Sequence, residues 1–207
     1  MITVAIARGR LLDEEVSLLE KAGYPVGNIL KDSRKLIFEY PGLEMKILII
    51  RPTDIPSYVE YGAADMGIVG MDTLMEEKHN LYEPLNLGIG QCKLVVAAPK
   101  GFEYNSSGSL RVATKYPRIA HEHFSGKGVG AEIVKLYGSV ELAPIVGLSD
   151  VIVDLSATGE TLRKNNLVEF ESIADISARL VVNRVSMKVK SEEIKEIINK
   201  LKQVREN

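Results

Sequence analysis

The sequence has little of what disulfide-bonded, metal-binding and membrane proteins depend on. Its 207 residues include one cysteine, Cys92, which excludes an internal disulfide bond. The three histidines, His79, His121 and His123, do not form a set of soft ligands at the spacing of a zinc site. No run approaches the ~18 apolar residues that a membrane span needs, and the first residues are not the basic leader of an exported protein. We therefore expect a cytoplasmic protein that does not enter a membrane.

An excess of charge of one sign is also absent. Lys and Arg number 26 against 28 Asp and Glu, and the net charge is −2. No block of basic residues could follow a nucleic-acid backbone, so we expect no non-specific binding to nucleic acid. Apolar residues make up 45% of the chain, which is enough for a soluble globular protein with a sizeable core.

The spacing of the apolar residues predicts an α/β fold. Residues 2–7 are apolar on both faces, as in a strand buried in a parallel sheet, and residues 11–22 have the periodicity of an amphipathic helix. Two extended runs at 35–40 and 45–50 flank the turn dipeptide Pro41-Gly42, which predicts a hairpin. We expect further strands at 66–69, 93–98, 111–114, 129–137 and 151–155, and helices at 57–61 (capped by Asp54), from Asp72, at 117–124 and from Ser191.

The last helix decides the predicted domain organisation. Its apolar residues form a single stripe, so it must pack on another part of the chain. We place it on the first group of strands, which makes a discontinuous first lobe of residues 1–88 plus 180–207 and a second lobe of residues 89–179. The prediction is two α/β lobes with a double crossover, like a periplasmic binding protein, and a cleft between the lobes.

The strongest functional signal is the strand, loop and helix of residues 151–162, Val-Ile-Val-Asp-Leu-Ser-Ala-Thr-Gly-Glu-Thr-Leu. The apolar strand brings Asp154 to its carboxyl end, where ligands bind in open α/β sheets. Gly159 lets the backbone approach an anion, and the N–H groups at the start of the helix point toward it. Hydroxyl donors are added by Ser156, Thr158 and Thr161. The segment predicts a phosphate-binding loop, with an ordinary helix start capped by Thr158 as the alternative.

The residues around this loop limit the class of ligand that it could bind. No Lys follows Gly159, and no Gly-x-Gly-x-x-Gly fingerprint occurs, so neither a Walker loop nor a dinucleotide site is expected. A carboxylate ahead of the loop, at Asp154, suits a ligand with both a phosphate and vicinal hydroxyls. The carboxylate accepts hydrogen bonds from the hydroxyls while the amides hold the phosphate. Phosphoribose is such a group.

A longer pattern includes the loop. It consists of Glu141, Gly147, Ser149, Val151, Asp154-Leu155, Thr158-Gly159 and Thr161-Leu162. This pattern resembles the signature of the ATP phosphoribosyltransferase family. Residues 7–11 (Ala-Arg-Gly-Arg-Leu), 33–36 (Ser-Arg-Lys-Leu), 51–72 and 111–117 are also similar to the family's motifs, with Arg8 in place of the usual Lys. Arg8 keeps the positive charge.

The resemblance implies the first reaction of histidine biosynthesis. N1 of the adenine of ATP displaces pyrophosphate from C1 of phosphoribosyl pyrophosphate, and Mg²⁺ is bound to the pyrophosphate of the substrate rather than directly to the protein. The implied phosphoribosyl pyrophosphate site consists of Asp154, Ser156, Ala157, Thr158, Gly159, Glu160, Thr161 and Leu162. The implied catalytic residues are Arg10 and Arg34, and the implied contacts to ATP or pyrophosphate are Arg8, Arg51, Asp72 and Glu141.

Each residue outside the loop also has a simpler interpretation. Any one of the arginines could be a solvated surface cation. Asp72 could cap a helix, and Glu141 could form an ion pair. Two other functions also stay open. One is a solute-binding protein without catalysis, and the other is a phosphoribosyltransferase for a different base. The latter usually has two adjacent acidic residues ahead of its loop, whereas Leu155 follows Asp154 here.

The resemblance also implies an assembly. Long members of the family carry a histidine-sensing domain at the C-terminus, for which we expect no residues after the helix from Ser191. The chain therefore resembles the short form. That form implies a homodimer within a hetero-oligomer that includes a regulatory subunit resembling histidyl-tRNA synthetase.

Overall fold

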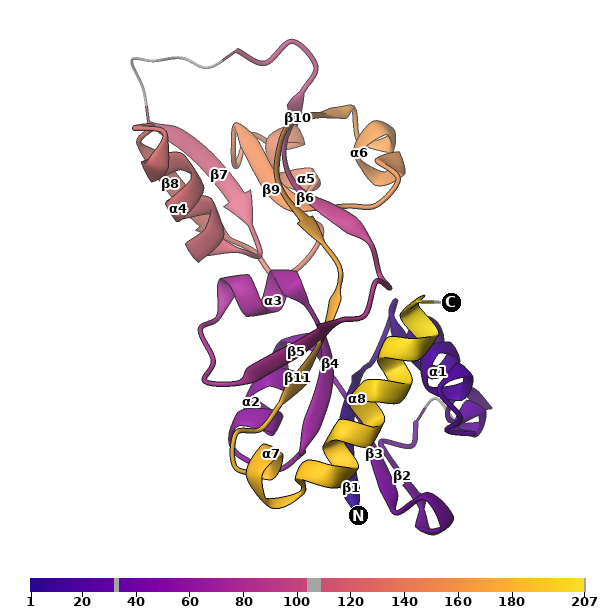
Figure 1. Ribbon diagram of the computed structural model, residues 1–207. Coiled ribbons are helices and arrows are strands. Elements are labelled where there is room, and N and C mark those ends of the chain that lie inside the picture. Colours follow the sequence, from indigo (N-terminus) through magenta and orange to yellow (C-terminus); the bar gives the residue numbers. More distant parts are fainter. Residues whose placement is uncertain (32–33, 104–108, 207) are drawn as a thin grey trace. The chain divides into compact units, whose positions relative to one another are not determined.

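The computed structural model describes residues 1–31, 34–103 and 109–206. The chain divides into two compact units (Figure 1). Unit 1 consists of Met1–Gly90 and Ser177–Asn207, and unit 2 of Gln91–Ile176. The first division follows Gly90, two residues after the predicted one. The second follows Ile176 instead of residue 179, because a strand of the unit 1 sheet already begins at Ala178.

Unit 1 is built on a six-stranded mixed sheet in the order β2-β3-β1-β4-β11-β5. The strands are β1 (Ile2–Ala7), β2 (Ile37–Tyr40), β3 (Met45–Ile50), β4 (Met66–Gly70), β5 (Tyr82–Asn86) and β11 (Ala178–Val182). Strand β1 lies parallel to both β3 and β4, whereas β11 is antiparallel to β4 and to β5. Strands β2 and β3 form the predicted hairpin, with the short helix η2 (Pro41–Leu43) as its turn.

The helices of unit 1 include the predicted C-terminal helix. They are α1 (Leu12–Lys21), η1 (Gly27–Lys31), η3 (Pro52–Asp54), α2 (Ile55–Glu60), α3 (Met71–Glu76), α7 (Ser186–Val189) and α8 (Ser191–Glu206). Ile194, Ile197 and Leu201 of α8 are buried in one cluster with residues of β1 and β4 such as Val4 and Ile68, so α8 packs on unit 1 as predicted (Figure 1).

One predicted helix cap is wrong. Asp54 has a helical backbone conformation, and among the described residues its side chain makes no capping hydrogen bond to α2. Its Oδ1 instead accepts the hydroxyl of Thr53 at 3.2 Å. The short helix η3 runs directly into α2, so Asp54 does not stand outside the helix as a capping residue must.

Unit 2 is built on a five-stranded sheet in the order β10-β6-β9-β7-β8. The strands are β6 (Cys92–Pro99), β7 (Leu110–Thr114), β8 (Ala131–Lys135), β9 (Val151–Ser156) and β10 (Leu167–Ile176), and the helices are α4 (Pro117–Gly126), α5 (Leu142–Ile145) and α6 (Glu160–Lys164). Strand β7 is parallel to β8 and β9, whereas β6 is antiparallel to β9 and β10. Strand β9 therefore lies in the middle of the sheet.

The sequence pattern missed β10, although it is the longest strand of unit 2. Its pairing with β6 shifts register between Glu169 and Glu171 and again between Ser172 and Ala174. Each shift breaks the two-residue alternation of buried and exposed side chains that identifies a strand in a sequence.

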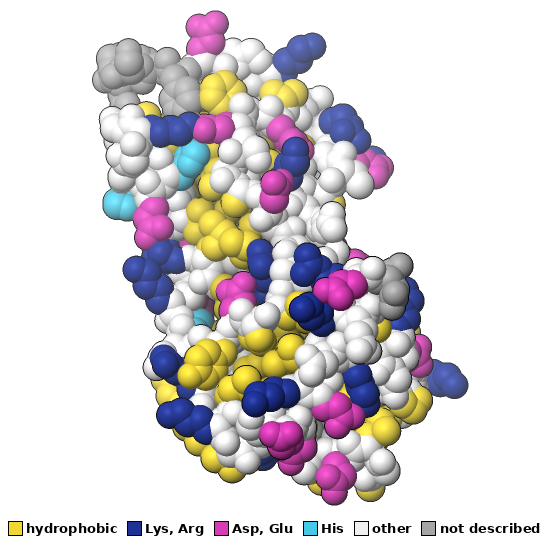
Figure 2. Space-filling view, viewed as in Figure 1, with side chains coloured by type: hydrophobic (Ala, Val, Ile, Leu, Met, Phe, Trp, Pro, Cys, Tyr) yellow, Lys and Arg dark blue, Asp and Glu magenta, His cyan; other side chains and the backbone are white. Residues whose placement is uncertain are grey.

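The surface matches the balanced composition. On the face shown in Figure 2, acidic and basic side chains are interspersed over both units. Within the described ranges, no helix is long and apolar enough to cross a membrane.

Candidate active site

The predicted phosphate loop follows β9 in unit 2. Asp154 is buried near the end of this central strand, and its Oδ1 accepts the backbone N–H of Leu155 at 2.9 Å. Ala157 and Thr158 are exposed beyond the strand, and the chain then enters the five-residue helix α6. The order of strand, carboxylate, exposed loop and helix is therefore confirmed.

Gly159 has the backbone conformation that the loop needs at its turn into α6. Its φ is +69°, in the left-handed region where a side chain is strained. A Cβ at this position would lie 3.0 Å from Nη1 of Arg163 and 3.4 Å from Oε1 of Glu169. The dihedral angle thus favours glycine, and a side chain here would also have to displace the ends of Arg163 and Glu169.

The residues of the loop differ in burial and in hydrogen bonding. The Oγ1 of Thr158 accepts the N–H of Glu160 at 3.3 Å, so Thr158 does help to start the helix. The side chain of Thr161 is exposed, whereas that of the next residue, Leu162, is buried in the core of unit 2. Leu162 therefore anchors α6 to the sheet, and only its backbone is available to a ligand. Glu160 pairs with Lys164 at 2.7 Å on the exposed side of the helix.

One predicted donor is engaged elsewhere. The hydroxyl of Ser156, which is buried, donates to Oε1 of Glu169 at 2.5 Å. Its single proton is therefore directed to β10, so in this structure the hydroxyl of Ser156 is not the donor to the loop that the sequence predicted.

The sequence pattern missed Arg163 and Glu169. Nη1 of Arg163 donates to the carbonyl oxygen of Thr158 at 3.0 Å. Helical spacing could have indicated Arg163, because it lies four residues after Gly159 at the start of α6. Nothing local could have indicated Glu169, since it reaches Ser156 from a different strand.

The predicted residues of unit 1 gather at one edge of its sheet. Arg8 and Arg51 directly follow β1 and β3, whose last residues, Ala7 and Ile50, are paired in parallel. The N–H of Arg8 also donates to the carbonyl oxygen of Ile50 at 2.7 Å. The carboxyl ends of these neighbouring strands therefore carry both arginines, and the side chains of both are exposed.

Three more predicted residues share this edge. Arg10 lies in the turn after β1, and half-buried Asp72 lies in the first turn of the helix after β4, which is also parallel to β1. Arg34 precedes β2, whose first residues pair with the end of β3, and its side chain is exposed. Ser33 of the same motif lies outside the described residues.

The structure gives Glu141 no hydrogen bond to the loop among the described residues. It is half-buried directly before α5, and among the described residues no hydrogen bond joins it to residues 154–162. The described part of the chain also has no group of three or more His, Cys, Asp or Glu side chains that could hold a metal ion. His123 instead contacts Glu171 at 3.3 Å.

A buried carboxyl group supports the turn that carries Arg8 and Arg10. Glu15 of α1 is fully buried, and its Oε2 accepts the backbone N–H of Ala7 at 2.8 Å. Burial raises the pKa of Glu15 well above its usual value, more than the hydrogen bond from Ala7 lowers it. The contact joins the end of β1 to α1 on both sides of the turn.

Comparison with known proteins identifies the family. A family model described as ATP phosphoribosyltransferase matches residues 51–203. The chain belongs to this family. An ATP phosphoribosyltransferase 2 of Geobacter sulfurreducens is 54% identical over 204 residues, which cover 97% of this chain and 96% of the relative. The ATP phosphoribosyltransferase of Thermoanaerobacter sp. (strain X514) is also 54% identical over 204 residues, covering 98% of this chain and 95% of the relative.

Solved structures agree with the family and with the fold. A chain of the "ATP phosphoribosyl transferase (HisG:HisZ) complex from Thermotoga maritima" has a TM-score of 0.86 and 37% identity, and the match covers 100% of this chain and 98% of that chain. The periplasmic aliphatic sulphonate binding protein SsuA of Escherichia coli has a TM-score of 0.63 at 11% identity, with coverage of 99% and 68%. The second match shows the fold alone, and it confirms the predicted class of two α/β lobes.

Proposed function

We propose that this protein catalyses the reaction of its family, in which the phosphoribosyl group of phosphoribosyl pyrophosphate is transferred to N1 of ATP. The observation that supports it best is the edge of the unit 1 sheet, where neighbouring strands bring together exposed arginines that are distant in the sequence: Arg8, Arg10, Arg34 and Arg51. Both substrates carry several phosphates, which such cations bind.

In this proposal the loop of unit 2 holds the phosphoribosyl group. The backbone N–H groups around Gly159 and at the start of α6 bind the 5-phosphate, and the hydroxyls of Thr158 and Thr161 add donors. The carboxylate of Asp154 accepts hydrogen bonds from the ribose hydroxyls. Ala157 contributes its backbone N–H, and the N–H of Glu160 orients the Thr158 hydroxyl by donating to its Oγ1. The arrangement suits a ligand that carries both a phosphate and a sugar.

The chemical step needs charge stabilisation and no nucleophile from the protein. The N1–C1 bond forms as the bond from C1 to the pyrophosphate oxygen breaks, and the pyrophosphate leaves with the electron pair. Negative charge grows on the leaving group, so donors aimed at it lower the barrier. We assign this role to Arg10 and Arg34.

The remaining predicted residues would orient the substrates. Arg8 and Arg51 bind phosphates of ATP or the pyrophosphate, and Asp72 binds an amine or hydroxyl of ATP. Glu141 contacts a ribose or a water bound to Mg²⁺. The Mg²⁺ ion arrives on the pyrophosphate of the substrate, because phosphate oxygens and water are its usual ligands in such reactions.

An experiment that varies the acceptor base tests the proposed reaction. The protein, with its partner subunit when the isolated chain is too slow, is incubated with phosphoribosyl pyrophosphate, Mg²⁺ and either ATP or a panel of free bases. We expect pyrophosphate release with ATP only. Release with a free base instead would indicate a different phosphoribosyltransferase. Tight sugar-phosphate binding without release in the complete assembly would indicate a binding protein.

We also propose that the protein works in the cytoplasm as a homodimer within a hetero-oligomer. The similar Thermotoga maritima chain comes from a HisG:HisZ complex, which supports a second, regulatory subunit, expected to resemble histidyl-tRNA synthetase. Histidine can change activity only by binding differently to two states of an assembly. We expect the isolated chain to be weakly active or inactive and indifferent to histidine. Strong inhibition by histidine without the partner would contradict this.

A further inference from the structure

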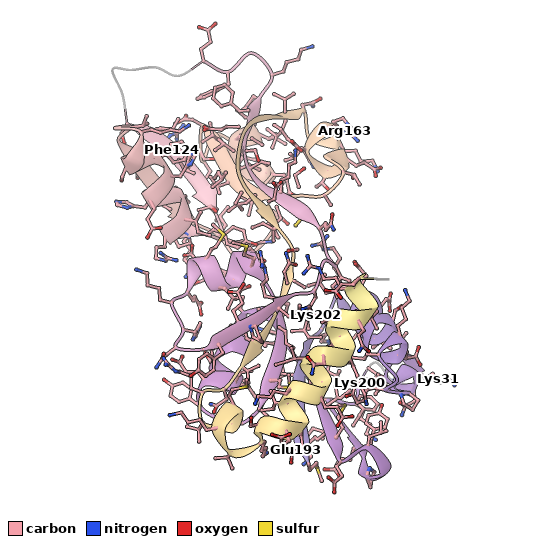
Figure 3. All side chains as sticks on the ribbon, in the orientation of Figure 1. Lys31, Phe124, Arg163, Glu193, Lys200 and Lys202 are labelled. Atoms are coloured by element: carbon pink, nitrogen blue, oxygen red, sulfur yellow. The ribbon has the colours of Figure 1, made fainter. Side chains whose placement is uncertain are left out.

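Two charged side chains that lie outside the family pattern hold the turn at Gly159 from two sides. Nη1 of Arg163 donates to the carbonyl oxygen of Thr158 at 3.0 Å. Oε1 of Glu169 accepts the hydroxyl of buried Ser156 at 2.5 Å. Both charged groups come close to Gly159, at 3.0 Å and 3.4 Å from the position of a Cβ. Figure 3 labels Arg163 on α6, the helix that follows the turn.

The contact of Arg163 determines which way a peptide group faces. In a trans peptide the C=O and the following N–H point in opposite directions. Because the carbonyl of Thr158 faces Arg163, the N–H of Gly159 faces away from it and is available to an anion. A peptide next to glycine turns over easily, since glycine tolerates φ of either sign. Without Arg163, the carbonyl oxygen of Thr158 could replace this N–H and repel a phosphate.

The neighbouring lysine does not share this role. Lys164 forms an ion pair with Glu160 at 2.7 Å, one helical turn apart on the exposed surface of α6. The guanidinium of Arg163 is directed instead to the turn, and its only hydrogen bond among the described residues is the one to the carbonyl oxygen of Thr158. The two adjacent cations therefore have different partners, and Lys164 is a matched control for Arg163.

Glu169 fixes the other end of the turn. By accepting the Ser156 hydroxyl, it joins the last residue of β9 to β10. The proton of Ser156 is thereby directed away from the loop, and the backbone N–H groups remain as its donors. An amide oxygen could accept the same hydrogen bond, whereas a methyl group could not.

We propose that Arg163 and Glu169 are positioning residues, which set the phosphate-binding shape of residues 156–159 before the substrate arrives. This inference rests on the proposed function of the loop. Preorganised donors lower the cost of ordering the loop on binding, so the two residues should control affinity for the 5-phosphate, not the rate of bond exchange.

Ribose 5-phosphate is the appropriate probe, because it carries the 5-phosphate without the pyrophosphate. Calorimetry on the full chain should show about tenfold weaker binding for Arg163→Ala, the size expected for losing a charge-assisted contact. Lys164→Ala should bind like the parent, and Arg163→Lys should recover part of the loss. Glu169→Ala should also bind more weakly, whereas Glu169→Gln should stay near the parent. Thermal unfolding checks that each variant is folded.

Kinetics on the complete assembly separate positioning from catalysis. Arg163→Ala should raise KM for phosphoribosyl pyrophosphate and leave kcat and KM for ATP near the parent values. Parent affinity for ribose 5-phosphate in Arg163→Ala, or a fall in kcat at unchanged KM, would overturn the role of Arg163. Tighter binding by Glu169→Ala would overturn the role of Glu169 and identify it as a competitor of the phosphate.

A further variant distinguishes failure of this inference from failure of the proposed function. Gly159→Val blocks the turn directly. If it binds ribose 5-phosphate like the parent, the loop is not the phosphate site. If it loses binding while Arg163→Ala and Glu169→Ala retain it, the loop is the site and only the positioning role is wrong.

Discussion

Gly70 and the carboxylate of Asp72 are packed so closely that a Cβ on Gly70 would overlap Oδ1 of Asp72. The backbone of Gly70 is extended, at φ −64° and ψ 141°, a conformation that any residue can adopt. Glycine therefore leaves room for the present position of the Asp72 carboxylate, which an alanine would displace. The carboxylate occupies this space at the edge of the sheet where the arginines lie.

Substitution of Gly70 by alanine should therefore act through Asp72. We expect Gly70→Ala and Asp72→Asn to raise KM for ATP, each by about tenfold, since a misplaced binding group loses a charge-assisted contact. Affinity for ribose 5-phosphate should not change. The measurement is steady-state kinetics with each substrate varied in turn.

The control for this prediction is Gly42→Ala. Gly42 lies in the turn between β2 and β3, and a Cβ there would meet nothing within 4 Å. It should leave KM for ATP unchanged. An unchanged KM in both Gly70→Ala and Asp72→Asn would show that Asp72 is only a residue of the first helical turn.

Gly159→Val tests the loop of unit 2. The positive φ of Gly159 and the close side chains both oppose a β-branched residue. We expect binding of phosphoribosyl pyrophosphate to be lost while ATP binding is largely retained, as measured by calorimetry. Unchanged affinity in a folded variant would remove the loop from the site.

Arg10→Ala and Arg34→Ala test the leaving-group role. Loss of a donor aimed at developing charge costs on the order of 3 kcal/mol in the barrier, or about a hundredfold in turnover. Single-turnover rates of the complete assembly should fall more than substrate affinity does. Lys21→Ala, which removes an exposed cation at the far end of α1, serves as the control. A parent rate in either arginine variant would make that residue a surface cation.

Glu15→Gln should change the pH dependence of stability. Because burial raises the pKa of Glu15 in the folded protein, its contribution to stability is present below the unfolded pKa of about 4.3 and is lost as pH rises toward the folded value. The free energy of unfolding of the parent therefore falls as pH rises through that window. Glutamine can accept the Ala7 N–H without a charge, so the variant should avoid this loss.

Urea unfolding of the parent and Glu15→Gln between pH 4 and pH 8 measures the effect. The free energy of unfolding of the variant minus that of the parent should increase as pH rises. A difference that does not vary with pH would mean that Glu15 has the same protonation in both states. Comparing kcat for the two proteins then shows whether the turn with Arg8 and Arg10 depends on this contact.

Asp65 should have the opposite pH dependence. Burial raises its pKa, but hydrogen bonds from Lys190 (2.9 Å), Ser186 (2.6 Å) and the N–H of Thr3 (2.9 Å) outweigh burial and hold the pKa below its usual value. The ionised Asp65 therefore stabilises the folded protein above pH ~4, its pKa in the unfolded chain. This stabilisation is lost as pH falls through the pKa of Asp65 in the folded protein.

Asp65→Asn should cost about 2 kcal/mol at pH 7, because it leaves Lys190 without its charged partner while that side chain stays partly hydrated. Between pH 5 and pH 3 the parent should lose more stability than the variant. Equal losses over that range, measured by urea unfolding, would show that Asp65 does not contribute to the acid sensitivity of unit 1.

The local sequence determined the features of this protein that are built from consecutive residues. The strand of residues 151–156, the glycine turn and the following helix are consecutive, so their apolar spacing and turn chemistry were enough to predict the loop. The β2–β3 hairpin was predictable for the same reason. The stripe of α8 also predicted that the C-terminus packs on another element, because an apolar face must be buried.

The tertiary structure alone decided which of the separated residues share a surface. Arg8, Arg51 and Asp72 lie at one edge of the sheet because β1 is parallel to β3 and β4, and the antiparallel β2 places Arg34 at the same edge. Strand pairing between distant segments depends on burial of the whole sheet, and no local pattern encodes it. The contact of Ser156 with Glu169 is hidden in the same way, since the bulges of β10 conceal the strand that delivers the carboxylate.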